Sequence, residues 1–178
     1  MKLSNITINR IIWLSLCAVM VALDQITKYF AALHLPSTGE HRFIPFLFDL
    51  VYVENRGAAW GMFENNRWIF MVTTSVAICL MLFFIMKLAN EHKMFCISLT
   101  MLLAGGIGNM IDRILQGFVV DFLQFGFWKS FPVFNVADCF VVIGCIMMGI
   151  YIIFFDKTIL RDAKPVPDPE GKDDGQND

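Results

Sequence analysis

The sequence predicts an all-α membrane protein with four transmembrane helices, and two observations support this fold class. Of the 178 residues, 57% are hydrophobic and only 17% are charged, and the mean hydropathy is +0.60. A soluble domain of this length needs more charge on its surface than that. Four apolar stretches also reach the roughly 20 residues that a helix needs to cross a ~30 Å hydrocarbon core. They cover residues 11–33, 68–88, 94–112 and 134–155.

The chain divides into a transmembrane domain, residues 1–158, and a polar tail, residues 159–178. The tail contains Pro165, Pro167 and Pro169 among charged residues, a composition that cannot bury a core and predicts disorder. At the other end, no small-residue cleavage site follows the first apolar stretch. We therefore expect a retained helix there and not a removable signal segment.

The distribution of basic residues predicts that both termini are cytoplasmic. With that orientation, eight of the 14 Lys and Arg residues lie on the cytoplasmic side, as the positive-inside rule favours. The second and third helices are joined by the short polar turn 89–93, so they are antiparallel neighbours.

The two longer connections lie on the opposite, outer side of the membrane. Between the first and second helices, residues 46–53 are rich in aromatic and β-branched side chains and are followed by Asn55-Arg56-Gly57. This pattern predicts a small β-like element, a strand or hairpin. The connection 114–133 carries several aromatic residues, which are typical of a membrane interface.

Composition also excludes several classes of function. A net charge of −2 argues against a nucleic-acid surface. The five cysteines lie inside apolar runs without the C-x-x-C spacing of a zinc or redox site, so we interpret them as small hydrophobic residues.

Polar residues gather at one end of the predicted bundle. In a four-span protein the first and third helices end where the second and fourth begin, and the two longer connections join these same ends. Ionisable groups inside a bilayer are costly and mark functional sites by default. The residues at this rim are Asp24, Lys28, Asn55, Asn109, Asp112, Arg113, Asp121, Asn135 and Asp138.

Two groups at the rim have a structural interpretation beside a functional one. Asp24 and Lys28 are spaced i, i+4, so they either form a self-compensating ion pair or orient a substrate or neighbouring backbone. Asn109, Asp112 and Arg113 share a helix face after a glycine-rich segment. They are either helix-packing contacts or part of a site, and Arg113 is the expected counter-ion of Asp112.

Asp121 and Asp138 differ because neither has a cation nearby in the sequence. If the two carboxylates meet, they cannot both ionise easily and would share a proton. Such a pair can activate water with its carboxylate and protonate a carbonyl with its acid, as aspartic peptidases do. The alternative is two separately hydrogen-bonded polar residues.

At this point the sequence resembles a known family, bacterial lipoprotein signal peptidase (signal peptidase II). Five short motifs carry the resemblance in the family's order, and together they span residues 24 to 138. They are Asp24-Gln25-Ile26-Thr27-Lys28, Asn55-Arg56-Gly57-Ala58-Ala59-Trp60-Gly61, Gly108-Asn109-Met110-Ile111-Asp112-Arg113, Val119-Val120-Asp121-Phe122 and Phe134-Asn135-Val136-Ala137-Asp138.

The resemblance implies an aspartic endopeptidase of the bacterial inner membrane, the target of globomycin, with its active site at the periplasmic face. Its substrates would be prolipoproteins bearing a diacylglyceryl group, cut just before the lipidated cysteine. The implied partners are these substrates and membrane phospholipid. The protein is expected to be a monomer, and the resemblance implies no metal or organic cofactor.

The resemblance also implies roles for individual residues. Asp121 and Asp138 match the catalytic pair, and Asp24 and Asn55 match a shell that contacts substrate and inhibitor. The remaining matched residues are expected to support the pair or bind substrate. They are Lys28, Gly57, Asn109, Asp112, Arg113, Asn135 and Ala137.

Two other functions remain as alternatives. A transporter or proton-conducting protein predicts polar residues through the depth of the bundle, yet the middles of the last three helices carry no charge. A non-enzymatic scaffold predicts that Asp121→Asn is tolerated. For a peptidase, we hypothesise that Phe125, Phe127 and Trp128 cover the cleft and hold the lipid.

Overall fold

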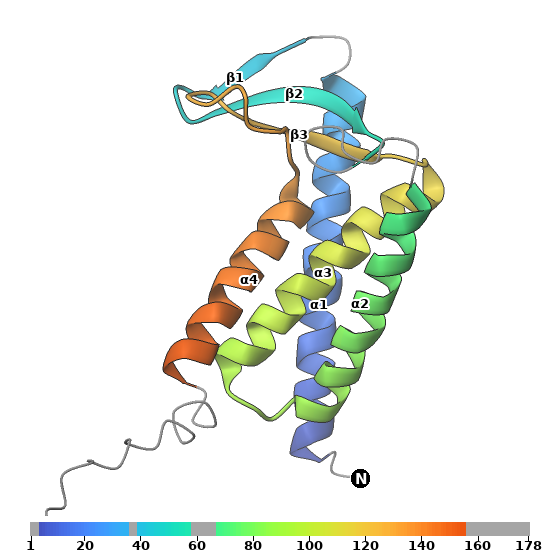
Figure 1. The fold of residues 1–178 in the computed structure, drawn as a ribbon, viewed down its shortest axis with the longest axis vertical. Helices are drawn as coiled ribbons and strands as arrows, with labels where there is room; N and C mark the ends of the chain where they lie inside the picture. Colours follow the sequence, from blue (N-terminus) through green and yellow to red (C-terminus); the bar gives the residue numbers. More distant parts are fainter. Residues whose placement is uncertain (1–3, 36–38, 58–66, 156–178) are drawn as a thin grey trace, which may run out of the picture.

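The computed structural model of the chain describes residues 4–35, 39–57 and 67–155. In this part of the chain the fold is mainly helical, with a small sheet at one end of a helical bundle (Figure 1). The elements are, in chain order, α1 (Asn5–His34), β1 (His41–Ile44), β2 (Phe48–Asn55), α2 (Arg67–Leu88), α3 (Lys93–Leu115), β3 (Val119–Phe125) and α4 (Val136–Phe154).

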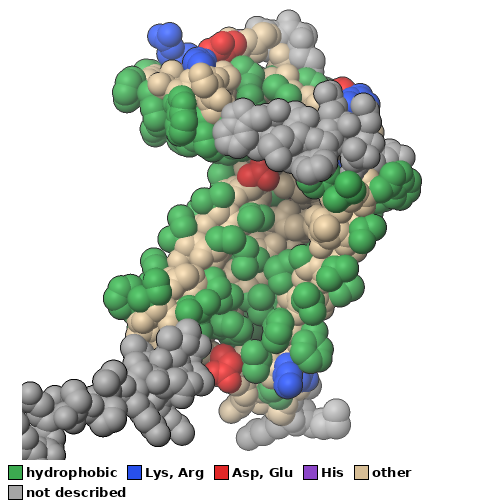
Figure 2. All heavy atoms as spheres, viewed as in Figure 1, with side chains coloured by type: hydrophobic (Ala, Val, Ile, Leu, Met, Phe, Trp, Pro, Cys, Tyr) green, Lys and Arg blue, Asp and Glu red, His purple; other side chains and the backbone are tan. Residues whose placement is uncertain are grey.

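All four helices are long and apolar enough to cross a membrane, which confirms the predicted fold class. In Figure 2 hydrophobic side chains cover the visible face of the bundle, and charged side chains lie near its two ends. α1 begins and α4 ends at the end of the bundle opposite the sheet (Figure 1). The two described termini of the bundle therefore lie on the same side.

The helices differ from the predicted ranges mainly at their ends. α1 starts at Asn5, six residues before the predicted start, because the Ser4 side chain caps it by accepting a hydrogen bond from the Thr7 N–H at 3.3 Å. α3 continues past the predicted residue 112 to Leu115 and ends before Gly117, whose φ is +81°. α4 starts at Val136, because Asn135 is its N-cap residue. The predicted tail lies outside the described residues.

α3 is the central helix of the bundle and packs against α1, α2 and α4. The buried core around it contains Cys17, Ile85, Leu99, Leu103 and Ala104. Glycines bring α4 close to α3: a Cβ at Gly105 would lie 2.5 Å from the Ala137 carbonyl oxygen, and one at Gly144 would lie 3.0 Å from that of Ser98. Small residues of this kind allow close backbone approach in membranes.

The sheet joins the two long connections. β1 and β2 form the antiparallel hairpin predicted between the first two helices, and β3 from the second connection pairs antiparallel with β2. This third strand was not predicted. Just before α4, Phe134 pairs with β3: Leu123 and Phe134 exchange backbone hydrogen bonds of 2.8 and 2.9 Å. The start of α4 is therefore fixed to the sheet.

Candidate active site

Asp121 and Asp138 are brought together at the junction of the sheet and the bundle. Asp121 lies in β3 and is 2% exposed, and Asp138 lies in the first turn of α4. Asn135, fully buried between them, donates its Nδ2 to Asp121 Oδ1 at 2.6 Å and its backbone N–H to Asp138 Oδ2 at 3.1 Å. The same residue caps α4 and forms a capping box with Asp138. A helix-capping motif thus links the two carboxylates.

Two more asparagines complete the hydrogen bonding of the pair. Asn55 Nδ2 donates to Asp121 Oδ2 at 2.8 Å, and Asn109 Nδ2 donates to Asp138 Oδ1 at 2.8 Å. The side chain of Asn55 is itself oriented by the Gly57 N–H, which donates to its Oδ1 at 3.0 Å. All four carboxylate oxygens therefore accept an N–H, and all their partners are neutral amides.

Burial and the negative charge of Asp138 raise the pKa of Asp121 from its ordinary value to about 7. The amides of Asn55 and Asn135 lower this pKa, but their effect is smaller. Among the described residues, neither Asp121 nor Asp138 has an ion-pair partner. Asp121 therefore retains a proton over much of the range below neutral pH.

Below the pair lies a buried ion cluster of Asp24, Lys28 and Asp112. Lys28 Nζ lies 2.9 Å from Asp24 Oδ2 and 2.9 Å from Asp112 Oδ2, and all three side chains are at most 3% exposed. The expected Asp24–Lys28 ion pair is present. The expected counter-ion of Asp112 was wrong, because Lys28 and not the adjacent Arg113 pairs with it.

Arg113 points elsewhere, because successive helical residues lie on different faces. Its guanidinium donates to the Asn109 carbonyl oxygen at 3.4 Å and lies 5.4 Å from the centre of the Phe70 ring. It stays near both carboxylates of the pair without forming an ion pair with either in the described part of the chain.

Two residues of this cluster were missed as site candidates. Gln25 Nε2 donates to Asp24 Oδ2, Gly108 O and Asp112 Oδ1 at 3.2, 3.1 and 3.0 Å. The sequence could have indicated Gln25, because it places a polar amide next to Asp24 inside an apolar stretch. Gly108 is required because a Cβ there would lie 2.5 Å from Asp24 Oδ2.

Asp121 and Asp138 open onto a cavity of about 570 Å³, a size common for ligand sites. Asp24, Lys28 and Asp112 are not among its described lining residues, so the part of the predicted shell that reaches the cavity is Asn55, Gly57 and Arg113. The described lining residues are Phe48, Asn55, Gly57, Phe70, Arg113, Asp121, Phe125, Phe131, Pro132, Val133, Phe134, Asp138, Cys139, Val142 and Ile143. The wall is therefore largely apolar, with its polar groups around the two carboxylates.

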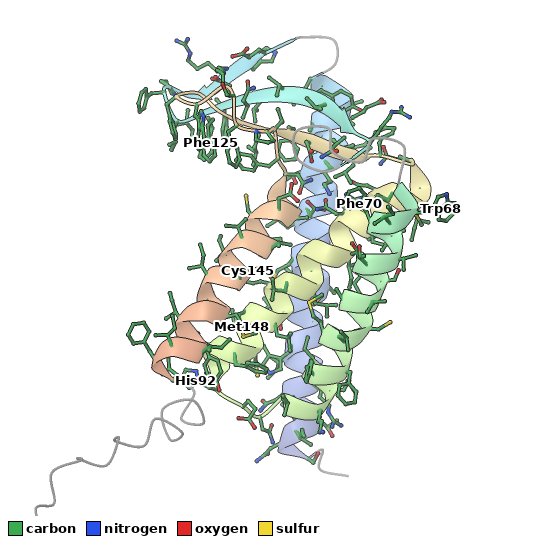
Figure 3. All side chains as sticks on the ribbon, viewed as in Figure 1. Trp68, Phe70, His92, Phe125, Cys145 and Met148 are labelled. Atoms are coloured by element: carbon green, nitrogen blue, oxygen red, sulfur yellow. The ribbon has the colours of Figure 1, made fainter. Side chains whose placement is uncertain are left out.

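An aromatic cluster forms the sheet side of the cavity. The Phe125 ring packs against those of Phe48, Phe131 and Phe134 at centroid distances of 5.4, 5.2 and 5.1 Å. In Figure 3 Phe125 points from the sheet toward the bundle, whereas Phe70 lies at the end of α2 nearest the sheet. Phe127 and Trp128 are about half exposed and are absent from the described lining, so Phe125 is the member of the hypothesised aromatic cover that reaches the cavity.

An ion pair outside the bundle holds the segment after β3. Lys129 Nζ contacts Asp49 on β2 and Glu40, and the hydrogen bond from Lys129 lowers the pKa of the Asp49 carboxyl. The Gly126 N–H also donates to Leu47 O at 3.0 Å. The segment that leads to Phe131 and Phe134 is therefore attached to the hairpin.

A membrane-spanning bundle that holds two amide-bound carboxylates at the wall of an apolar cavity is the arrangement expected of an aspartic peptidase of the membrane. A family profile described as signal peptidase (SPase) II matches residues 16–154. The chain belongs to the signal peptidase II family. This membership sets aside the transporter and scaffold alternatives.

Similar proteins agree with the assignment. The chain is 46% identical over 137 residues to a lipoprotein signal peptidase of Caldanaerobacter subterraneus subsp. tengcongensis, covering 77% of this chain and 92% of that protein. It is 38% identical over 144 residues to a lipoprotein signal peptidase of Symbiobacterium thermophilum, covering 80% and 94%. A solved structure described as a bacterial membrane enzyme superposes with a TM-score of 0.73 at 30% identity, covering 80% of this chain and 93% of that chain.

All eleven residues predicted for the site have a contact in this network or line the cavity. The structure thus places them together but at two depths, with the carboxylate pair at the cavity and the ion cluster behind it. Residues 58–61 of the second motif lie outside the described residues.

Proposed function

We propose that this protein removes the signal peptide from prolipoproteins whose cysteine carries a diacylglyceryl group, cutting just before that cysteine. In this proposal Asp121 and Asp138 are the catalytic residues. The protein acts as a monomer among the phospholipids of the bacterial inner membrane, with its termini in the cytoplasm and its cavity at the periplasmic face. The observation that carries the proposal is the amide-bound carboxylate pair at the wall of a mainly apolar cavity.

The proton of the pair is assigned to Asp121, because the pKa of its carboxyl is raised to about 7. Asp138 is assigned as the carboxylate because it lies in the first turn of α4, where its Oδ2 accepts the backbone N–H of Asn135. The N-terminus of a helix stabilises negative charge there.

Hydrolysis then follows general acid–base chemistry. Asp138 removes a proton from water as the water oxygen attacks the scissile carbonyl carbon, and Asp121 protonates the carbonyl oxygen. In the second step Asp121 takes a proton from a hydroxyl of the tetrahedral intermediate. Asp138 then protonates the departing nitrogen as the carbon–nitrogen bond breaks. Both carboxyl groups return to their starting states.

The cavity suits a substrate that arrives within the membrane. Val142 and Ile143 of α4 line the cavity and are also 56% and 46% exposed, so its wall continues onto the lipid-facing surface of the helix. An acylated segment can enter along this surface while its polar peptide bond reaches the carboxylates. The apolar wall supplies the contacts for the lipid.

The proposal is tested with purified protein in phospholipid vesicles and a prolipoprotein peptide made with and without the diacylglyceryl group. We expect the lipidated peptide to be cut with kcat/KM at least about 100-fold higher, because lipid burial contributes about 0.8 kcal/mol per CH₂. Mass spectrometry of the products should place the cut before the cysteine. Equal cleavage of both peptides, or a cut elsewhere, would contradict the proposal.

The raised pKa of Asp121 predicts a basic limit to activity near pH 7. Above that pH the acid needed to protonate the carbonyl is lost, so kcat/KM should fall as pH rises. Asn55→Ala removes an amide that lowers the pKa of Asp121, and it should therefore move this limit to higher pH. Cleavage rates measured from pH 5 to pH 9 check both statements, and a limit that Asn55→Ala leaves in place would refute the assignment of the proton.

A further inference from the structure

Lys28 occupies the centre of the polar network although it does not line the cavity. Its side chain is 3% exposed, and its ammonium contacts three oxygens, Asp24 Oδ2 and Asp112 Oδ2 at 2.9 Å and Asn109 Oδ1 at 2.8 Å. Because both carboxylate oxygens touch the same nitrogen, they lie within roughly 6 Å of each other, a range in which like charges repel strongly. Lys28 is what allows two buried carboxylates to stay this close.

Each of these carboxylates also holds the backbone just before one residue of the catalytic pair. Asp24 Oδ1 accepts the N–H of Ala137 at 2.8 Å, and Ala137 precedes Asp138. Asp112 Oδ2 accepts the N–H of Val120 at 3.2 Å, and Val120 precedes Asp121. Charge-assisted hydrogen bonds of this kind are stronger and more directional than neutral ones.

The third contact of Lys28 sets the orientation of Asn109. Lysine has donors only, so the atom of Asn109 that faces it must be the oxygen. That oxygen also accepts from Asn135 Nδ2 at 3.1 Å, which leaves Asn109 Nδ2 to donate to Asp138 at 2.8 Å. An Asn109 amide turned the other way would place its oxygen against the Asp138 carboxylate.

We propose that Lys28 is a positioning residue that fixes the separation and orientation of Asp121 and Asp138 through Asp24, Asp112 and Asn109. The proposal rests on the proposed function, in which Asp121 and Asp138 are the reacting groups. Two of the three connections reach backbone on different elements, β3 and α4, and the third reaches the Asp138 side chain directly. Lys28 thus acts on both catalytic groups at once without touching substrate.

A simpler role would be charge neutralisation alone, and the two roles predict different results. Asp24→Asn/Lys28→Met/Asp112→Asn removes all three charges of the cluster, so no buried charge is left unpaired. The amide oxygens that replace the two carboxylates can still accept from the N–H groups of Ala137 and Val120. Lys28→Arg keeps the cation but replaces the compact ammonium by a larger planar group. If Lys28 only neutralises charge, both variants should cleave substrate normally.

As positioning variants, both should insert and unfold like the wild type, with KM within about threefold and kcat lowered about 100-fold, the usual cost of moving a catalytic group by ~1 Å. Lys87→Met is the matched control, because Lys87 is exposed at the other end of α2 and packs on Phe83. If the triple variant does not fold, Lys28→Arg decides by the same criterion.

The measurement is steady-state cleavage of the lipidated peptide in vesicles, normalised to folded protein, with Asp121→Asn assayed in parallel. A folded Lys28 variant with wild-type kcat overturns the positioning role while wild-type cleavage and an inactive Asp121→Asn keep the proposed function intact. An active Asp121→Asn would instead remove the proposed function itself, so the two failures are distinguishable.

Discussion

Asp138→Asn and Asp121→Asn are each expected to lower kcat for the lipidated substrate by about 1,000-fold or more, because each removes one partner of the acid–base pair. The asparagine side chain has the shape of aspartate and can still accept one of the hydrogen bonds that the carboxylate accepts. Folding should therefore change little, and KM should stay close to the wild-type value. Steady-state kinetics together with thermal unfolding in detergent check this expectation.

Asp49→Asn is the matched control for these variants. Asp49 is also a buried aspartate of the sheet, but it pairs with Lys129 and is not among the described residues of the cavity wall. It should keep at least about a third of wild-type activity, since its effect is limited to an ion pair that is partly exposed. Substantial turnover by either Asp121→Asn or Asp138→Asn would rule out the pair.

Asp112→Asn tests whether the ion cluster behind the cavity takes part in the reaction or only supports the carboxylate pair. Asp112 is a third buried carboxylate near the pair, but it is 1% exposed and its Oδ2 faces Lys28 and the Val120 N–H. Because Asp112 lies behind the pair, Asp112→Asn should lower kcat clearly less than Asp121→Asn does. An equal loss in both would place Asp112 in the reaction.

Gly105→Ala should have the second large effect, on both stability and turnover. The added Cβ would lie 2.5 Å from the Ala137 carbonyl oxygen and 2.6 Å from Val141 Cγ2, so α4 must move away from α3. Overpacking of this kind costs about 1–3 kcal/mol of unfolding free energy, which corresponds to a fall in melting temperature of roughly 5 °C. Because Asp138 follows Ala137, kcat should also fall by about 100-fold.

The neighbouring glycine provides the control. A Cβ at Gly106 would meet its nearest neighbour, Ile78 Cγ1, at an ordinary 3.5 Å. Gly106→Ala should therefore leave the melting temperature at or slightly above the wild-type value, since alanine favours helix by about 1 kcal/mol over glycine. Equal destabilisation by the two substitutions would mean that glycine is needed for helix flexibility and not for the α3–α4 contact.

The four helices and the polar end of the bundle were predictable because each depends on local sequence. An apolar stretch of spanning length identifies a helix, and antiparallel order decides which helix ends meet. The predicted ends were less accurate, since α1 extends through polar residues up to its cap at Ser4. A hydropathy pattern does not reveal the part of a helix that continues beyond the membrane.

β3 was missed because its sequence lacks the expected alternation. Val119, Val120, Asp121 and Phe122 are all buried, so both faces of the strand are covered and no period of two arises. Its partner strand lies far away in the chain, with Asn55 opposite Val119. The pairing that places Asp121 at the site is therefore a tertiary property.

The counter-ion of Asp112 could not be predicted from the sequence either, because ion pairing also depends on tertiary packing. Arg113 is adjacent in sequence, yet the partner in space is Lys28, on another helix. The motifs named residues that the structure brings together, but only the packing of α1 against α3 decides which charges meet. Sequence neighbours were a poor guide because consecutive helical residues point in different directions.

The bond between Asp24 and the Ala137 N–H spans 113 residues, and this separation has a consequence for how the enzyme is made. The chain is synthesised from its N-terminus, so α1 with Asp24 and Lys28 is produced long before α4. Until α4 docks, the Asp24 contact, the junction of Phe134 with β3 and Asp138 itself are all absent. In the proposed mechanism the nascent polypeptide is therefore inactive until the last helix is in place.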